Sequence, residues 1–315
     1  MRAMLVTAGF GTRLAPLTDL LPKPAVPVVN RPIAVFAIEH LQRAGVREFV
    51  LNTHHLPAEL EREVRAAAPS GVALRFVHEP VILGTGGGVR NAWQPQHGET
   101  FIVMNGKVLY APDIAAALRL HRESRALATM IVVPVPVGDP LGAIKIDAEG
   151  QVHGVPGMVP AAHAQVRGML YTGISLLEAR AHADLPASGC LMRDAYRHWV
   201  ERGECVMAYV DGGSFRDVGM SLWHYWEANM ALLRGTARWP GLIPDAAGVL
   251  AAEGVQIGSR AQVRETALGR GARIAPGVRV ADCVVWPGAH VERDLDTAIV
   301  LPDGRVLPVP PRPRS

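Results

Sequence analysis

The sequence contains little cysteine, and this shortage narrows the kind of protein it encodes. Its three cysteines are odd in number and far apart along the 315 residues: Cys190, Cys205 and Cys283. That pattern argues against a disulfide framework and against a zinc site, and it suits a reducing compartment. We therefore expect a cytoplasmic protein without disulfides.

Long apolar runs are also missing. No run reaches the ~20 residues that a bilayer-spanning helix needs. The apolar start, residues 1–7, continues into Gly9, Phe10 and Gly11 without a small-residue cleavage site. We interpret it as a first strand and not as a signal peptide, and we expect no membrane partner.

Lysine is scarce, and the total charge is small. The formal net charge is +3, too low to indicate a nucleic-acid partner by its field alone. The 32 basic residues include only three lysines: Lys23, Lys107 and Lys145. Two explanations are possible: lysine is kept where a compact ammonium is needed, or codon bias favours arginine and the three lysines remain by chance.

Alternating strand and helix patterns fill the first part of the chain. Strands are predicted at residues 4–6, 48–51, 73–77, 101–104, 128–135, 142–146, 169–176 and 206–210. Helices are predicted at residues 32–44, 57–68, 114–123, 191–202 and 221–234, and Asp113 is the expected N-cap of the third. This alternation indicates an α/β, Rossmann-like fold with a mixed, mostly parallel sheet.

In such a fold the ligand binds at the carboxyl ends of the strands. Four segments fall there: residues 9–23, 52–55, 84–88 and 105–107. Two of them are rich in glycine, so we expect them to be loops that approach a ligand closely.

Six-residue repeats begin near residue 245. Ile257, Leu268, Ile274 and Val280 each start a segment with a small residue close behind. This is typical of a short β-helix, in which each aliphatic side chain points into a narrow prism; an irregular, strand-rich tail is the alternative. We predict two to three coils over residues 245–303, which must pack on the first domain or on another subunit of a homo-oligomer. Residues 304–315 are predicted to be a disordered tail.

The opening loop, residues 9–23, combines glycine with cations. Gly9 and Gly11 let the backbone approach a ligand, and free N–H groups along such a loop can hold phosphate oxygens. Arg13 offers a planar fork to a polyphosphate, and Lys23 offers a compact charge. A dinucleotide fold needs a third glycine soon after, and a P-loop needs Gly-Lys-Ser/Thr; the sequence has neither. The loop therefore predicts a phosphate site of another kind.

This loop resembles the signature of the sugar-1-phosphate nucleotidyltransferases, also called NDP-sugar pyrophosphorylases. The matching residues are Gly9, Gly11, Thr12, Arg13, Pro16, Thr18, Pro22, Lys23 and Pro24. Three later segments are similar to further motifs of that family: residues 79–88, residues 171–174, and residues 215–219 with Asp217. A short left-handed β-helix is a common C-terminal addition in the family. The chain looks closest to its bacterial mannose-1-phosphate guanylyltransferase and muramyl-sugar uridylyltransferase branch.

The resemblance implies a nucleotidyltransferase domain over residues 1–240. It implies transfer of a nucleotidyl group from an NTP (GTP or UTP) to a hexose-1-phosphate, with release of pyrophosphate. Arg13 would hold the departing phosphates, Lys23 would stabilise the transition state, and Asp217 would bind Mg²⁺. The implied nucleotide-binding residues are Ala8, Gly9, Gly11, Thr12, Arg13, Glu79, Gly84, Thr85 and Gly86. The implied sugar-phosphate-binding residues are Gly142 and Thr172.

Lys107 departs from the family pattern. Family members usually carry Asn-Gly-Asp after the fourth strand, and that Asp binds the metal, whereas this chain carries Asn105, Gly106 and Lys107. At ~4 Å, exchanging attraction for repulsion changes the energy of a nearby Mg²⁺ by several kcal/mol. One hypothesis is that Lys107 pairs with Asp217 in place of the metal. The alternative function is therefore a catalytically impaired relative that binds sugar nucleotide and acts as a regulatory or binding subunit.

Overall fold

The computed structural model describes residues 1–96, 99–136, 139–158 and 166–313. The chain forms two compact units. The first comprises Met1–Phe10 and Ala34–Phe215, and the second comprises Gly11–Ile33 and Arg216–Ser315. The opening loop thus leaves the first unit after Phe10 and belongs with the C-terminal part of the chain. The predicted domain boundary near residue 240 stays a prediction, because the units do not follow the order of the sequence.

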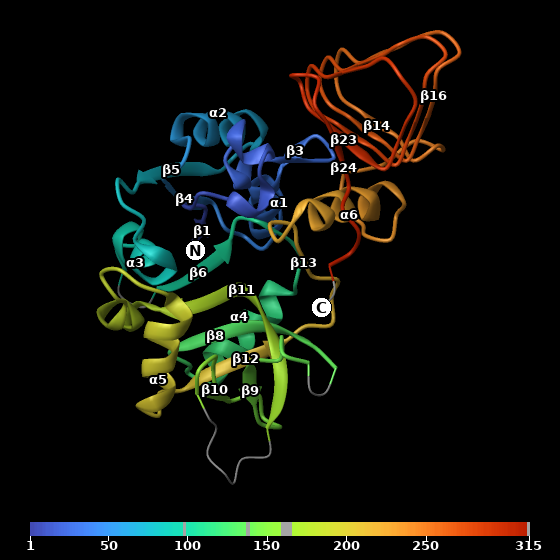
Figure 1. Cartoon of the computed structure of the whole chain (residues 1–315). Helices are drawn as coiled ribbons and strands as arrows, with labels where there is room; N and C mark the ends of the chain where they lie inside the picture. The colour runs from blue at the N-terminus through green and yellow to red at the C-terminus, as the bar shows by residue number, and fades with distance from the viewer. Residues whose placement is uncertain (97–98, 137–138, 159–165, 314–315) are drawn as a thin grey trace. The chain divides into compact units, whose positions relative to one another are not determined.

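A nine-stranded mixed sheet forms the centre of the first unit. Its strands are β1 (Arg2–Val6), β4 (Glu48–Thr53), β5 (Ala73–His78), β6 (Thr100–Asn105), β8 (Ala128–Pro134), β9 (Ile144–Ile146), β10 (Val152–Gly154), β11 (Arg167–Glu178) and β12 (Val206–Val210). Figure 1 shows them in the order β5, β4, β1, β6, β11, β8 and β12. β1 is parallel to β4 and β6, β4 is parallel to β5, and β12 is parallel to β8. β11 is antiparallel to its neighbours β6, β8 and β9, so the sheet is mixed as predicted.

Helices cover this sheet. They are α1 (Ile33–Arg43), α2 (Pro57–Ala67), α3 (Gly84–Ala92), α4 (Ile114–Glu123), the 3₁₀ segment η4 (Ala179–Asp184), the π-helical segment η5 (Leu191–Tyr196) and α5 (Arg197–Glu201). α4 has its predicted bounds, and the Asp113 side chain accepts the Ala116 N–H at 2.9 Å as the predicted N-cap. α3 contacts β1 and β4, and α4 contacts β8 and β12. The Trp93 ring after α3 stacks on Phe101 of β6 at 4.6 Å between centroids, within the buried core.

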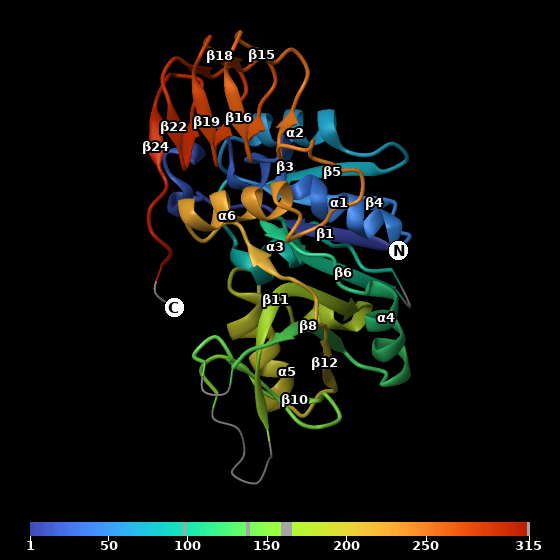
Figure 2. The same cartoon turned by 90° about the vertical axis from the view of Figure 1, so that its right-hand side faces the viewer.

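The second unit contains α6 (Leu222–Leu233) and a short β-helix. The β-helix has three sheets of stacked strands, in the orders β14-β17-β20-β23-β24, β15-β18-β21 and β16-β19-β22. The strands are β14 (Leu250–Ala251), β15 (Gln256–Ile257), β16 (Gln262–Arg264), β17 (Ala267–Leu268), β18 (Arg273–Ile274), β19 (Arg279–Ala281), β20 (Val284–Val285), β21 (His290–Val291), β22 (Leu295–Asp296), β23 (Ala298–Val300) and β24 (Val306–Pro308). The coils have a triangular outline in Figure 1, and Figure 2 shows β16, β19 and β22 stacked side by side. This arrangement is compatible with the predicted left-handed β-helix.

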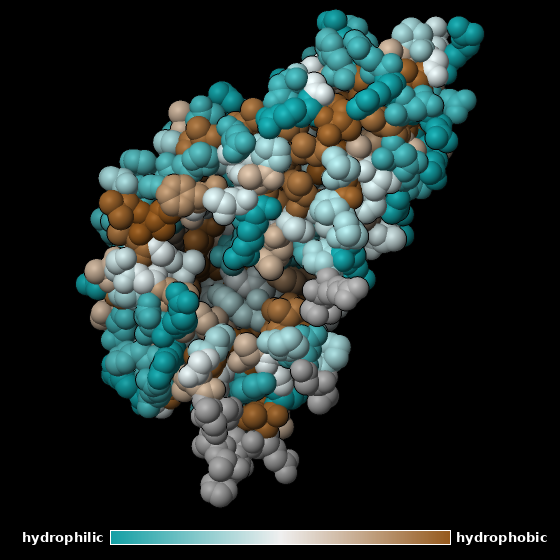
Figure 3. Space-filling model, in the orientation of Figure 1, coloured by the Kyte–Doolittle hydropathy of each residue, from teal (hydrophilic) through white to brown (hydrophobic). Residues whose placement is uncertain are grey.

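The six-residue pattern predicts most of the β-helix core. Leu268, Ile274 and Val280 are buried among other aliphatic side chains. Ile257 is different, because 49% of its surface is exposed. It lies on β15, which pairs only with β18, so no further coil covers that side of it. Figure 3 shows hydrophilic residues over much of the β-helix face in view.

Part of the predicted disordered tail is ordered. β24 runs antiparallel to β23, with Leu307 opposite Ile299. Its proline, Pro308, lies at the end of the strand, where a missing N–H does little harm to a ladder. The composition of the tail did not predict this strand.

Short elements complete the chain. The first unit also contains β7 (Val108–Leu109), and the second contains β2 (Pro27–Val28), β3 (Arg31–Pro32), β13 (Arg216–Asp217) and three 3₁₀ turns, η1 (Thr12–Leu14), η2 (Leu17–Asp19) and η3 (Lys23–Ala25). No helix of the described residues is long and apolar enough to cross a bilayer.

The hairpin of β2 and β3 has a turn that its own residues do not favour. Val29 and Asn30 have φ values of 39° and 69°. Two left-handed residues suit a hairpin turn, but asparagine followed by glycine is the usual pair, and a β-branched valine there costs roughly 1–3 kcal/mol. The tertiary structure holds the turn: the Val29 N–H donates to Asn229 Oδ1 at 2.7 Å. The Asn30 amide donates to the carbonyls of Leu250 and Leu268 at 3.1 and 3.0 Å.

Candidate active site

The carboxyl ends of four parallel strands meet at one edge of the first unit's sheet. The segments that follow β1, β4, β5 and β6 lie there because these strands are neighbours and share one direction. The sequence predicts this edge as the ligand site. The start of the opening loop, Ala8 to Phe10, leaves the sheet at this edge, and the Phe10 ring contacts the His54 ring edge-on at 5.0 Å between centroids.

Asn52 is the centre of a buried polar network at this edge. Its side-chain oxygen accepts the N–H groups of Thr7 at 2.7 Å and Ala8 at 3.2 Å, and its amide donates to Glu79 Oε1 at 2.8 Å. The other carboxylate oxygen of Glu79 accepts the Leu83 N–H at 3.1 Å. Asn52 and Glu79 are each only 1% exposed. The network therefore ties Thr7 and Ala8, just before the opening loop, to the segment that leads into α3.

Residues 84–88 were expected to be a glycine-rich loop, and that prediction is wrong: they form the first turns of α3. Their glycines allow close packing instead. A Cβ on Gly84 would meet the Gly189 carbonyl oxygen at 2.4 Å, and one on Gly88 would meet Asn52 Nδ2 at 2.7 Å. The Gly86 N–H donates to the same Gly189 carbonyl at 2.9 Å.

Thr85 strengthens the same attachment. Its hydroxyl oxygen accepts the Leu191 N–H at 2.8 Å. Helix propensity opposes a helix of this composition, and packing against residues 186–191 overrides it. Some of the backbone N–H groups at the start of α3 therefore donate to acceptors within the protein.

In the second unit, the opening loop places its two cations against one short segment. Lys23 Nζ donates to the Gly219 carbonyl at 3.0 Å, and the Arg13 guanidinium contacts Met220 Sδ at 3.3 Å. Asp217 begins this segment, and its carboxylate accepts the Gly219 N–H at 3.0 Å. The three predicted catalytic residues are therefore brought together.

Gly11 allows this arrangement. It has φ 70°, and a Cβ there would meet Thr18 Cγ2 at 2.8 Å and Lys23 Cβ at 3.2 Å. Leu14 and Leu17 are fully buried and anchor the loop, while Thr12 and Arg13 are exposed. A loop that buries Leu14 and Leu17 and exposes Arg13 is suited to an anionic ligand.

The comparisons with known proteins identify the family. The sequence model described as "Nucleotidyl transferase" matches residues 2–235. The chain belongs to this family. It is 30% identical over 296 residues to mannose-1-phosphate guanylyltransferase of Mycobacterium tuberculosis, covering 92% of this chain and 81% of that protein. It is 29% identical over 248 residues to UTP–glucose-1-phosphate uridylyltransferase of Synechocystis sp., covering 74% of this chain and 63% of that protein.

A solved structure shows the same fold. The crystal structure of HddC from Yersinia pseudotuberculosis, complexed with GMP-PN, superposes with a TM-score of 0.60 and 23% identity. The match covers 72% of this chain and 97% of that one. The mixed sheet of this nucleotidyltransferase is thus that of a known fold, and the predicted resemblance to the sugar-1-phosphate nucleotidyltransferases is confirmed.

Lys107 lies in the turn between β6 and β7 of this nucleotidyltransferase. Asn105, two residues before it, packs so closely on Gly173 that a Cβ there would meet Asn105 Nδ2 at 2.1 Å. Two carboxylates of the first unit are occupied by other hydrogen bonds. Asp113 caps α4, and Asp211 accepts the Tyr110 hydroxyl at 2.6 Å. Burial is the main cause that raises the pKa of the Tyr110 hydroxyl, and this hydrogen bond is the second. The hydroxyl therefore keeps its proton and acts as a donor.

The residues present do not fit the metal site that the resemblance implies. Lys107 occupies the sequence position at which the resemblance places the second carboxylate. Within the described parts of the chain, no group of three or more His, Cys, Asp and Glu side chains could hold a metal ion. Mg²⁺ prefers several oxygen ligands, and an ammonium provides none.

The predicted sugar-phosphate residues lie in the first unit. The Thr172 side chain is buried, and its hydroxyl donates to the Ile131 carbonyl at 2.7 Å, beside the register shift between β11 and β8. Gly142 lies just before β9, and its carbonyl accepts Lys145 Nζ at 2.7 Å. Gly142 has no side chain, and the Thr172 hydroxyl already donates to Ile131, so neither residue offers a free side-chain donor.

Sequence reasoning missed Asn52 as a site residue, although it placed residues 52–55 at the correct edge. The signal was available, because an amide at the end of an apolar strand has to find buried partners. It also missed residues 186–191, which hold α3. Nothing in their sequence indicates that contact, since it depends on glycines about a hundred residues away.

Proposed function

We propose that this nucleotidyltransferase joins a nucleoside triphosphate to a sugar-1-phosphate. A phosphate oxygen of the sugar-1-phosphate attacks the α-phosphorus in line, the bond from that phosphorus to the bridging oxygen breaks, and pyrophosphate leaves. The protein aligns the anions and neutralises their charge. Relatives named for guanylyl transfer to mannose-1-phosphate and uridylyl transfer to glucose-1-phosphate support this reaction.

One observation carries the proposal: Arg13 and Lys23 contact the segment that follows Asp217. We assign Arg13 to the departing phosphates and Lys23 to the charge that develops at the α-phosphorus. The backbone of Ala8, Gly9, Gly11 and Thr12 would face the nucleotide, since this stretch carries the family's signature. Among described residues, nothing within 4 Å would meet a Cβ on Gly9, so the backbone is open to a ligand there.

The remaining assignments rest on the first unit. We propose that Glu79, Gly84, Thr85 and Gly86 border the nucleotide through their backbone, because their side chains and several of their amides are used internally. Gly142 and Thr172 would border the sugar phosphate in the same way.

A divalent metal is typical of the family, and we propose a reduced role for it here. Neutralising phosphate oxygens is the chemistry that Mg²⁺ supplies in such a reaction, and Asp217 is the acid that the resemblance assigns to it. Because Lys107 supplies a positive charge at the position of the second carboxylate, we expect side-chain cations to take over part of that neutralisation.

We also propose a cytoplasmic location, because the cysteines are free. We further propose that the protein self-associates through the β-helix, which light scattering would test.

Pyrophosphate release by the purified protein tests the reaction. GTP and UTP are each offered with mannose-1-phosphate or glucose-1-phosphate, with and without Mg²⁺. We expect release that needs both substrates, and a variant Lys107→Asp whose rate depends more steeply on Mg²⁺ than the wild type. No release by the wild type, together with release by Lys107→Asp, would overturn the enzymatic proposal and leave a nucleotide-binding protein.

A further inference from the structure

The opening loop is attached to the β-helix through α6. All contacts described below lie within the second unit, which contains both the loop and the β-helix. We propose that the β-helix positions the nucleotide loop, with Asn30, Tyr225 and Trp286 as positioning residues. This inference rests on the proposed function of the loop and adds a role for the C-terminal coils.

The first attachment is a buried chain of hydrogen bonds. Trp286 Nε1–H of the β-helix donates to the Tyr225 hydroxyl at 3.0 Å, and that hydroxyl donates to the Pro27 carbonyl at 2.7 Å. Tyr225 is fully buried and Trp286 is 2% exposed. A buried donor or acceptor that loses its partner is costly, so this chain fixes the position of Pro27, four residues after Lys23.

The second attachment holds the hairpin turn. Asn30 donates to the carbonyls of Leu250 and Leu268, which belong to neighbouring coils, while Asn229 of α6 accepts the Val29 N–H. Asn229 in turn donates to the Tyr225 carbonyl at 2.8 Å. The turn has an unfavourable backbone conformation, so its shape depends on these partners.

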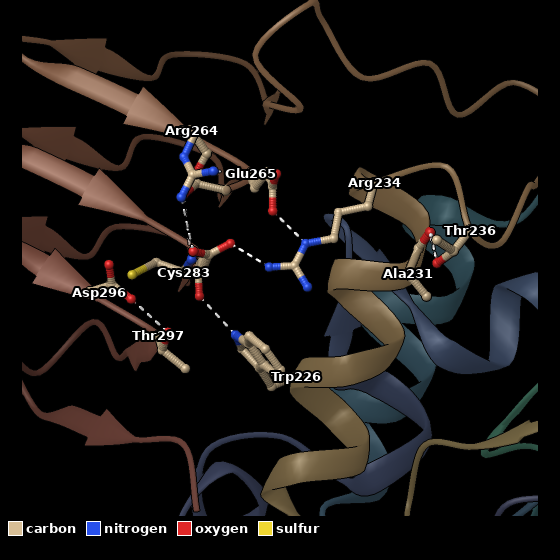
Figure 4. A network of polar contacts seen from close by, with 11 residues as sticks. Trp226, Ala231, Arg234, Thr236, Arg264, Glu265, Cys283, Asp296 and Thr297 are labelled. Carbon is tan, nitrogen blue, oxygen red and sulfur yellow. Dashed lines mark hydrogen bonds and ion pairs between the residues drawn. The ribbon is translucent and has the colours of Figure 1, made fainter. Parts of the chain in front are cut away.

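α6 is itself fixed on the β-helix by a polar network (Figure 4). Arg234, just after the helix, contacts both Glu265 and Asp282 on successive coils. Trp226 Nε1–H donates to the Asp282 carbonyl at 2.7 Å, and the Arg234 guanidinium lies over the Trp226 ring at 5.7 Å. Burial raises the pKa of Asp282, and the hydrogen bond from Arg234 lowers the pKa of Glu265.

The segment before α6 touches the two cations of the loop. Lys23 contacts Gly219, and Arg13 contacts Met220. α6 begins two residues after Met220, at Leu222. The β-helix therefore fixes α6, and α6 fixes the loop at both of its ends. A loop held in this way loses less entropy when it binds a triphosphate, so loosening it should weaken nucleotide binding.

Two substitutions remove the attachments, and a third controls for the packing that is lost with them. Trp286→Phe keeps a buried aromatic ring but deletes the N–H donor. Asn30→Gly keeps the left-handed backbone, which glycine adopts easily, but deletes both bonds to the coils. Val285→Ala is the matched control, because it weakens the β-helix core next to Trp286 without touching either attachment.

Titration calorimetry with GTP and with UTP measures the effect independently of turnover. For each positioning variant we expect the Kd of the nucleotide to rise about fivefold, as for the loss of one or two hydrogen bonds. The KM of the sugar-1-phosphate should stay unchanged, and Val285→Ala should lower the unfolding midpoint with the nucleotide Kd of the wild type. The double variant Trp286→Phe/Tyr225→Phe should bind no more weakly than Tyr225→Phe alone, because both act through one chain of bonds.

Wild-type Kd values for Trp286→Phe and Asn30→Gly would overturn the inference, as would a Val285→Ala variant that loses nucleotide affinity to the same extent. A wild type that binds neither nucleotide would overturn it as well. A wild type that binds nucleotide but releases no pyrophosphate would instead overturn the proposed function and leave the binding comparison intact.

Discussion

Asn52→Leu should destabilise the first unit more than any surface substitution can. The two side chains have similar size and branching, so the change removes the amide and leaves the volume. Three groups lose a partner: the N–H groups of Thr7 and Ala8 and one carboxylate oxygen of Glu79. The environment is buried, since Asn52 and Glu79 are each 1% exposed.

The expected cost follows from these three bonds. An orphaned buried group costs ~1–3 kcal/mol, and a charged acceptor lies at the upper end of that range. The Ala8 bond is the longest at 3.2 Å, and Ala8 is only half-buried, so it contributes least. We expect a loss of about 4 kcal/mol in the free energy of unfolding, a large part of the ~5–15 kcal/mol that holds a typical protein folded.

Urea unfolding followed by circular dichroism measures this loss, with an unchanged slope as evidence that the same surface unfolds. Asn91→Leu is the matched control, because Asn91 lies on α3 with its side chain exposed. It should change stability by less than ~0.5 kcal/mol. A loss below ~1 kcal/mol for Asn52→Leu would refute the reasoning, because water would then replace the lost hydrogen bonds at little cost.

Three further outcomes are expected. Gly173→Ala should cost ~2–4 kcal/mol in urea unfolding, because the residue has φ 82° and its Cβ would meet Asn105 Nδ2 at 2.1 Å; a neutral result would mean that Asn105 moves freely. Burial lowers the pKa of His121 below its usual 6.5, so the unfolded chain takes up this proton first and stability should fall as pH drops below ~6.5. A pH series on His121→Gln should be flatter there, and an unaltered slope would exclude His121 as its source. Lys23→Met should slow pyrophosphate release ~100-fold without moving the unfolding midpoint, and a smaller effect would exclude a role in the transition state.

Periodicity predicts the main elements of this protein well. The strand at Val206–Val210 and the helix at Ile114–Glu123 have the predicted bounds, because an apolar run and an amphipathic stripe with a cap are local properties. The six-residue repeats likewise indicate the coils. β24 was not predicted because the tail is rich in proline and arginine, although its partner β23 lies close by in the chain. The hairpin of β2 and β3 was not predicted because its turn is stabilised by partners far along the chain.

The opening loop shows how far the sequence reaches into the site. Its glycines, prolines and cations indicate phosphate binding without any structure, because backbone freedom and charge belong to the residues themselves. The position of Lys107 after a buried strand also follows from the sequence, and so does its departure from the metal-binding Asp of the family.

Tertiary structure alone decided the rest. It made residues 84–88 a helix, because glycines without a Cβ can pack against Gly189. It made Asn52 the centre of the network, because only the sheet brings Thr7 and Glu79 to it. It also joined the loop to a β-helix more than two hundred residues away, through contacts whose partners no local pattern reveals. The sequence by itself determined which side chains are available for the chemistry, and long-range packing decided which of them stay free for a ligand.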